Sequence, residues 1–159
     1  MQLKDLLKSP EMLDMFRTRS PAHGDLCAEL TIDPEGVPLL HIPYQSRFAR
    51  SELQPSLHAG VVMTAMDSAM GLATMLEMEE LSSLATLELR YDELRPPEKE
   101  GGISIQSQCD SIDDGIAYLT SAASDSTGVF AKAVARFILT PGSSSFLETA
   151  MAAMNGEQT

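Results

Sequence analysis

One charged side chain stands alone in the most apolar part of the chain. Asp67 is the only formally charged residue in the segment 53–76, if histidine is counted as neutral. A carboxylate buried without a partner costs several kcal/mol. Asp67 is therefore either held by hydrogen bonds within the core or used for chemistry. The chemistry open to it is general-base attack on water or nucleophilic attack on a carbonyl carbon.

The residues that open the same apolar segment offer a second chemical element. The first N–H groups of a helix have no partner within it, and the helix dipole favours negative charge there. The N–H groups of Ala59 and Gly60 are thus candidates to stabilise a developing oxyanion. For His58 we favour a side-chain hydrogen bond that fixes the turn over a role in proton transfer.

The spacing of these two elements has a geometric consequence. Ala59 and Asp67 are eight residues apart on one predicted helix, which is about 12 Å along the axis. Both cannot touch one carbonyl group within a single chain, whereas antiparallel helices of two chains can bring them together. The hypothesis is a homodimer with two equivalent sites, and pairing of dimers into a tetramer stays open.

The elements that must position these residues follow a simple order. Apolar residues at helical spacing predict N-terminal helices within 1–20 and a short C-terminal helix at 144–154. Period-two alternation predicts two strands before an apolar helix at 58–78 and four after it: 25–32, 37–43, 85–94, 101–110, 115–124 and 129–140. In the strand 85–94 the alternation places Leu87, Leu89 and Tyr91 on one face.

A helix that is apolar on nearly every face must be wrapped, and strands joined by hairpins form an antiparallel sheet. We therefore expect one α+β domain over residues 1–159, with its core at 25–140. Its curved antiparallel sheet wraps one long central helix, which is the arrangement of the hotdog fold.

The composition of the chain limits which classes of partner it is expected to bind. The net charge of −12 repels phosphate backbones, so we expect no nucleic acid, although a local basic pocket could still hold a phosphorylated small molecule. The apolar helix nearly has the length of a membrane span, but its hydroxyl side chains and Asp67 make that costly, and we expect no membrane. The N-terminus has no continuous apolar stretch and carries acidic residues, so it does not resemble a secretory signal, and we expect a cytoplasmic protein.

The two cysteines, Cys27 and Cys109, have no metal-binding spacing. Both fall in predicted strands, which favours buried free thiols. No His/Cys/Asp cluster has ligand spacing, so no metal site is expected.

Two motifs resemble the acyl-CoA thioesterases of the phenylacetic-acid-degradation (PaaI-like) type, a family of hotdog proteins. The first is Leu57-His58-Ala59-Gly60 followed by Asp67 and Ala69-Met70-Gly71, and the second is the strand that ends in Leu94-Arg95-Pro96. The element order matches over 25–140. The resemblance implies hydrolysis of an acyl-CoA thioester to a carboxylic acid and coenzyme A. No further cofactor is implied, because coenzyme A is part of the substrate.

The resemblance also implies residue roles. With the spacing from His58 it favours the chemical role for Asp67, and it implies that the N–H of residue 59 donates to the thioester carbonyl. Thr86 matches a hydroxyl residue that orients the water, although an ordinary strand residue is nearly as good an interpretation. The candidate substrate-binding residues are Gln54 for the carbonyl, Met63 and Met70 for the acyl group, and Arg95, with Arg47, Arg50 and Arg90 as alternatives, for the phosphates. Core filling by the methionines and salt bridges by the arginines remain open.

Two positions depart from the family pattern. Ala59 stands where the family usually has glycine, and it keeps the N–H donor. Glu52 stands where many relatives have Asn or Gln, and an ionised carboxylate cannot donate to a carbonyl. These departures leave open a non-catalytic acyl-CoA-binding hotdog protein. A hotdog dehydratase or hydratase acting on 3-hydroxyacyl thioesters is a further alternative, although its motifs are not found.

Overall fold

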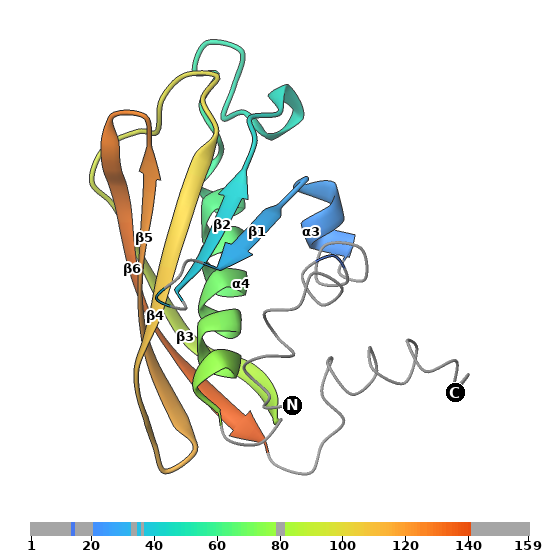
Figure 1. Cartoon of the computed structure of the whole chain (residues 1–159). Coiled ribbons are helices and arrows are strands. Elements are labelled where there is room, and N and C mark those ends of the chain that lie inside the picture. The colour runs from blue at the N-terminus through green and yellow to red at the C-terminus, as the bar shows by residue number, and fades with distance from the viewer. Residues whose placement is uncertain (1–13, 15–20, 33–34, 36, 79–81, 141–159) are drawn as a thin grey trace.

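The computed structural model describes residue 14 and residues 21–32, 35, 37–78 and 82–140. Apart from residue 14, which is helical, the helices predicted at 1–20 and 144–154 lie outside the described residues. In chain order (Figure 1) the elements are α3 (Pro21–Asp25), β1 (Glu29–Ile32), β2 (Pro38–Ile42), the 3-10 turn η1 (Ser46–Phe48), α4 (Ala59–Glu77), β3 (Ser83–Glu93), β4 (Ile103–Asp113), β5 (Ile116–Asp125) and β6 (Gly128–Thr140).

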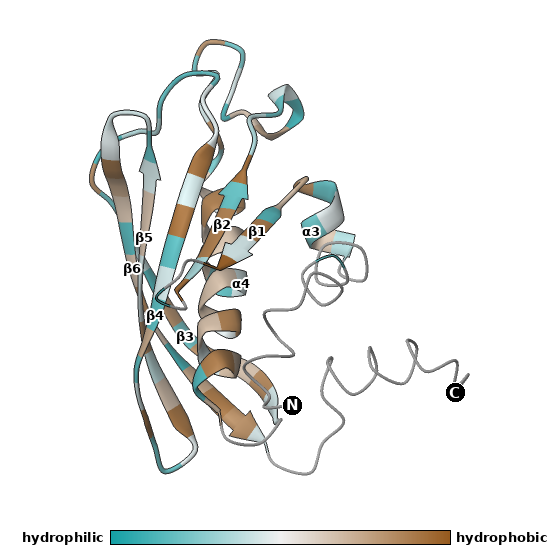
Figure 2. Cartoon of the chain, in the orientation of Figure 1, coloured by the Kyte–Doolittle hydropathy of each residue, from teal (hydrophilic) through white to brown (hydrophobic). Residues whose placement is uncertain are grey.

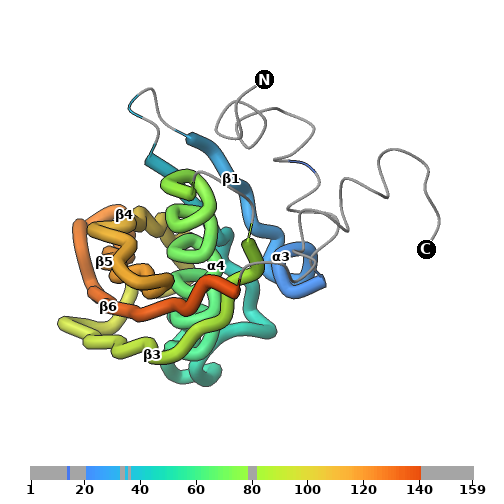
Figure 3. Tube along the Cα trace, turned by 90° about the horizontal axis from the view of Figure 1, so that it is seen from below, coloured from blue at the N-terminus to red at the C-terminus, as the bar shows by residue number. Residues whose placement is uncertain are grey.

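All six strands form one antiparallel sheet in the order β1-β2-β4-β5-β6-β3. The sheet curves around α4, as the view along the helix shows (Figure 3). By length and composition alone α4 could span a membrane. Half of its most apolar window is buried within this protein. The predicted α+β arrangement, a curved sheet around one long helix, is confirmed.

The core lies between α4 and the concave face of the sheet. Figure 2 shows α4 apolar over most of its surface, whereas the strands alternate apolar and polar residues. The concave face of the sheet carries large apolar side chains, mainly on β2 and β4, and several small ones on β5 and β6. The small ones are the fully or almost fully buried alanines Ala117, Ala123, Ala131, Ala133 and Ala135. The helix fills the space with larger side chains, including Val62, Met66 and Met70, which are completely buried.

The first strand is shorter than predicted. The sequence predicts a strand over 25–32, but α3 extends to Asp25 and β1 begins only at Glu29. Between them Cys27 adopts a left-handed conformation with a φ of 51°, which a strand residue does not have. Residues 26–28 therefore connect α3 to β1 through a turn, although their apolar and polar residues alternate as in a strand.

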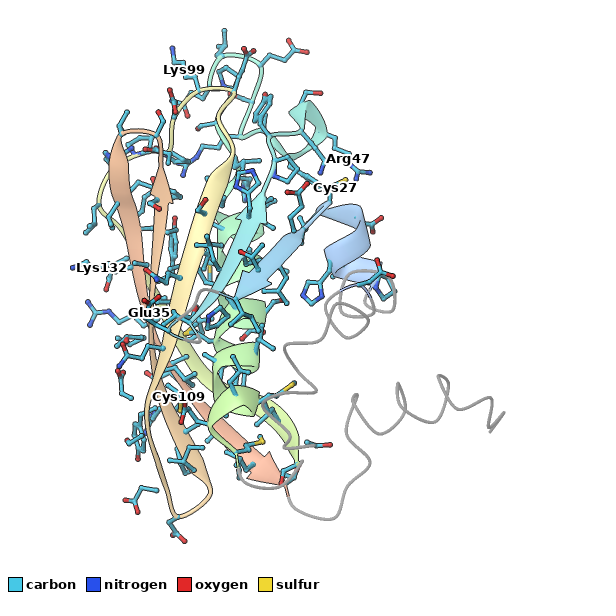
Figure 4. The ribbon with its side chains drawn as sticks, viewed as in Figure 1. Cys27, Glu35, Arg47, Lys99, Cys109 and Lys132 are labelled. Atoms are coloured by element: carbon cyan, nitrogen blue, oxygen red, sulfur yellow. The ribbon has the colours of Figure 1, made fainter. Side chains whose placement is uncertain are left out.

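The prediction of two buried thiols is also wrong. Cys27 is exposed and Cys109 is only partly buried, and Figure 4 shows them in separate parts of the molecule. Burial raises the pKa of the Cys109 thiol above its usual value, which disfavours the reactive thiolate.

Strand β3 contains a bulge that the alternation does not predict. Its register with β6 shifts between Thr86, opposite Phe137, and Glu88, opposite Arg136. Leu87 is the extra residue, and its side chain is 54% exposed rather than buried with Leu89 as predicted. A bulge changes which face the following residues occupy. Because of it Thr86 lies on the same face as Leu89, from which it is separated by an odd number of positions.

Candidate functional site

One side of α4 is left uncovered by the sheet. Gly60, Met63 and Thr64 are exposed and Asp67 is half-buried. Their spacing of three and four residues places them on one stripe of the helix. The isolated carboxylate of the sequence therefore lies at the margin of the core and not in its centre.

Thr86 holds the carboxylate of Asp67. The Thr86 hydroxyl donates to Asp67 Oδ1 over 2.8 Å. Only one carboxylate oxygen is used by this bond, so the other can accept a proton from water or attack a carbon. The structure thus brings together two of the predicted catalytic residues, which are 19 positions apart in sequence.

The start of α4 is fixed by His58. This residue is the N-cap, with extended backbone angles, and its Nδ1 accepts the N–H of Gly60 over 3.0 Å. With Nδ1 as the acceptor, the neutral ring carries its proton on Nε2. The turn-fixing bond expected of His58 is present, and as a result the Gly60 N–H is already occupied.

Of the two expected oxyanion donors, Ala59 is the one left available. Its N–H has no hydrogen-bond acceptor among the described residues. It is the first residue of α4 and half-buried, so its donor points out of the helix end at which the dipole is positive.

A small hollow lies over this helix start. Its volume is about 240 Å³, and its lining includes Phe48, Gly60, Val61 and Thr64. Typical small-molecule sites measure roughly 300–1,000 Å³, so the hollow of one chain is small for an acyl group with its carrier. Three larger hollows, of about 640, 470 and 320 Å³, are lined by residues other than the predicted catalytic ones. The small hollow is the one that adjoins the start of α4, through Gly60.

Some of the other predicted substrate-binding residues are exposed, and others are buried or already paired within the chain. Gln54 is exposed in a turn of the loop before α4, as is Glu52, and Met63 is 37% exposed on the uncovered stripe. Met70 is completely buried, which favours core filling over substrate contact for this residue.

Arg95 is held in an ion pair. Its guanidinium donates to both carboxylate oxygens of Asp125 over 2.7 Å, and to the carbonyls of Gly128 and Pro96. A phosphate would compete with all four bonds, so the salt bridge is the interpretation that the contacts favour.

A cluster of polar side chains at the end of β3 was not predicted from the sequence. Arg50 forms an ion pair with Glu93, and Tyr91 donates its hydroxyl to Glu93 over 3.1 Å. Burial, and then donation to Glu93, raises the pKa of the Tyr91 phenol above its usual range. Tyr91 and Glu93 are two and four positions after Leu89. Because alternate residues of a strand share a face, the strand pattern could have placed both on the side that faces α4.

The described ranges contain no group of three or more His, Cys, Asp or Glu side chains that could hold a metal ion.

No protein-family model matches this chain, and no curated protein sequence does either. Solved structures do match it. A thioesterase from Haemophilus influenzae has a TM-score of 0.73 at 17% identity, over 83% of this chain and 90% of that one. A thioesterase family protein from Silicibacter pomeroyi has a TM-score of 0.71 at 24% identity, over 82% and 96%.

A protein from Ralstonia eutropha described as related to phenylacetic acid degradation has a TM-score of 0.66 at 18% identity, over 78% of this chain and 96% of that one. These likenesses establish that the chain has the fold of these thioesterase-type hotdog proteins. At sequence identities this low the likenesses show the fold alone. The chemistry of this chain must be inferred from its own site residues.

Proposed function

We propose that this protein is an acyl-CoA thioesterase that hydrolyses its substrate to a carboxylic acid and coenzyme A. The observation that carries the proposal is the bond from Thr86 to Asp67 on the uncovered stripe of α4. It fixes a carboxylate where a substrate has access. The available N–H of Ala59 at the helix start supplies the other half of an acyl-transfer site.

In this mechanism a water molecule lies next to Asp67 and is oriented by Thr86. Asp67 takes a proton from this water. The resulting hydroxide attacks the thioester carbon, and the carbonyl oxygen becomes an oxyanion that accepts the N–H of Ala59 from the partner subunit. The C–S bond then breaks, and the leaving thiolate of coenzyme A takes up the proton that Asp67 removed from the water, which restores the Asp67 carboxylate. Direct attack by Asp67, followed by hydrolysis of the anhydride, gives the same products.

A homodimer is part of the proposal, because eight residues of helix separate Ala59 from Asp67. The edge of the sheet supports this arrangement. β3 is a terminal strand 11 residues long, and a long edge strand is a template for pairing with another chain. Exposed apolar side chains lie on and near it: Met63, Leu87 and Leu94.

Arg47 is our candidate for a coenzyme A phosphate. Arg50, Arg90, Arg95 and Arg136 each pair with a carboxylate. Among the described residues Arg47 instead bonds only Gln45 and the Asp25 carbonyl, with its guanidinium 4.6 Å from the centre of the Phe48 ring. Phe48 lines the hollow at the helix start. In Figure 4, Arg47 lies at the end of the molecule where α4 begins.

The test is thiol release from short, medium, long and aryl acyl-CoAs by the wild type and Asp67→Asn. We expect turnover by the wild type and a loss of about 100-fold or more in the variant. Thr86 can still donate to the side-chain amide oxygen that replaces the carboxylate in this variant, so the fold should persist. Binding without thiol release by either protein would contradict the proposal in favour of an acyl-CoA-binding role. Water addition to an enoyl thioester would favour a hydratase.

A further inference from the structure

The loop that leads into α4 is closed by its own backbone bonds. His58 N–H donates to the Phe48 carbonyl and Arg50 N–H to the Ser56 carbonyl, both over 2.9 Å, and Ala49 forms an isolated bridge with Leu57. The two ends of the loop therefore move together. A contact that fixes the position of Arg50 therefore also fixes the residues just before α4.

The Arg50 side chain connects this loop to β3. Its Nε donates to the carbonyl of Leu57, the residue before the N-cap, over 3.3 Å, and its Nη2 forms the ion pair with Glu93. Glu93 is the last residue of β3 and is also bonded by Tyr91. One arginine thus links the carbonyl beside the helix start to the end of a strand.

The same strand holds Asp67 through Thr86. β3 is therefore bonded to both chemical elements of its own chain, the carboxylate and the helix start. If two chains pair through β3, the position of each helix start relative to this strand sets its position relative to the carboxylate of the partner subunit.

From these contacts we propose that Arg50 and Glu93 are positioning residues, which aim the N–H of Ala59 at the thioester oxygen by fixing the turn at Leu57. The inference rests on the proposed thioesterase function. Arg50 and Glu93 touch no reacting atom and act through the backbone of the helix start. Their side chains are 22% and 24% exposed, so water still reaches the ion pair and screens it in part. Displacement of a catalytic group by a fraction of an ångström, however, lowers turnover strongly.

The chain offers a matched control. Glu88 lies on the same strand and pairs with Arg136 on the side away from α4. Glu93→Gln and Glu88→Gln each remove one carboxylate charge from β3 with little change in shape. Only Glu93→Gln disconnects the helix start.

We expect Glu93→Gln to lower kcat about tenfold with KM changed less than about twofold. Glu88→Gln should stay near the wild type in both. Arg50→Gln combined with Glu93→Gln should be no slower than the slower single variant, because both remove one interaction. Amide hydrogen exchange of a peptide covering residues 57–62 should be faster in Glu93→Gln than in Glu88→Gln.

An unchanged kcat in Glu93→Gln, or equal losses in the two variants, would overturn the positioning role. If the wild type hydrolyses none of the acyl-CoAs, the proposed function fails, and the exchange rates then decide the inference separately. Faster exchange confined to Glu93→Gln would keep the link between β3 and the helix start, whereas equal exchange in both variants would remove it.

Discussion

Thr86 faces Asp67 because a bulge at Leu87 takes up the one residue by which β3 exceeds its pairing with β6. The bulge at Leu87 turns Thr86 toward α4, where its hydroxyl donates to Asp67 Oδ1. The residues after the bulge, Leu89 and Tyr91, keep packing on the core. A local irregularity of the edge strand thus gives the carboxylate its only side-chain partner among the described residues.

Replacing Thr86 tests whether this bond matters for chemistry. Loss of a hydrogen bond to a charged group costs about 1.5 kcal/mol, so Thr86→Val should lower kcat about tenfold. Thr86→Ser keeps the hydroxyl and should stay close to the wild type. Steady-state kinetics with the best acyl-CoA of the panel measures both. Equal activity of the two variants would show that the bond has no catalytic role.

Proline at position 59 tests the N–H donor without breaking the helix. Ala59 is the first residue of α4, where proline is favoured, and His58 already has the extended backbone (φ −67°, ψ 141°) that a following proline requires. Ala59→Pro should lower kcat about 100-fold and change stability by less than about 1 kcal/mol. Ala59→Ser, which keeps the N–H, is the control. Full activity of the proline variant would exclude this donor.

Mixed dimers test the proposal that each site uses two chains. Asp67→Asn and Ala59→Pro should each be inactive alone. When the two are unfolded and refolded together in equal amounts, half of the dimers should be mixed, each with one intact site. About a quarter of the wild-type activity should return. No recovery, with mixed dimers demonstrated by mass spectrometry, would mean that both groups act within one chain.

Arg47→Gln tests the phosphate contact. A charge lost at the carrier end of the substrate should raise KM and leave kcat nearly unchanged, since the reacting atoms are not touched. The increase should be about fivefold, and it should shrink at high salt. Lys132→Gln, on the outer face of β6, is the charge-matched control. The same KM in both variants would remove Arg47 from the binding site.

The ion pair of Arg95 with Asp125 predicts a pH dependence of stability. Asp125 has a fully buried side chain, and its bonds to Arg95 hold the pKa of its carboxyl well below the usual range. The stabilisation is therefore present above the unfolded-state pKa of about 4 and is lost as the pH falls below it.

Asp125→Asn should accordingly lower stability by about 2 kcal/mol at neutral pH, and its Tm should approach that of the wild type in acid. Asp92→Asn, which breaks an exposed pair with Arg90, should change Tm little. Thermal unfolding followed by circular dichroism across the acid range measures both variants. A constant difference in Tm at every pH would contradict the assignment.

The central helix was predictable because its cause is local. Residues 58–78 are apolar at nearly every position, and α4 covers Ala59–Glu77. The β4–β5 hairpin was predictable for a similar reason: Asp114 and Gly115 both have positive φ, as the Asp-Gly pair favours. Patterns of this kind need only a few neighbouring residues.

The bulge and the closed loop could not be predicted in this way. Leu87 continues the alternation of Leu89 and Tyr91, and only the pairing of β3 with β6 shows that it is the extra residue. Cys27 likewise looks like a strand residue until α3 and its turn are in place. The contact of Arg50 with Glu93 spans 43 positions, and no local pattern connects them.

The bulge also means that different evolutionary constraints act on the two parts of β3. After Leu87 the strand must preserve a packing surface, and before it the strand must present one hydroxyl to α4. Deletion of the codon for Leu87 would restore regular pairing with β6 and would leave Thr86 two positions from Leu89, so both would still lie on the face toward α4. A lineage could thus lose the bulge in one genetic step and keep the orientation of its carboxylate, so relatives whose β3 differs by one residue in length could share the same site.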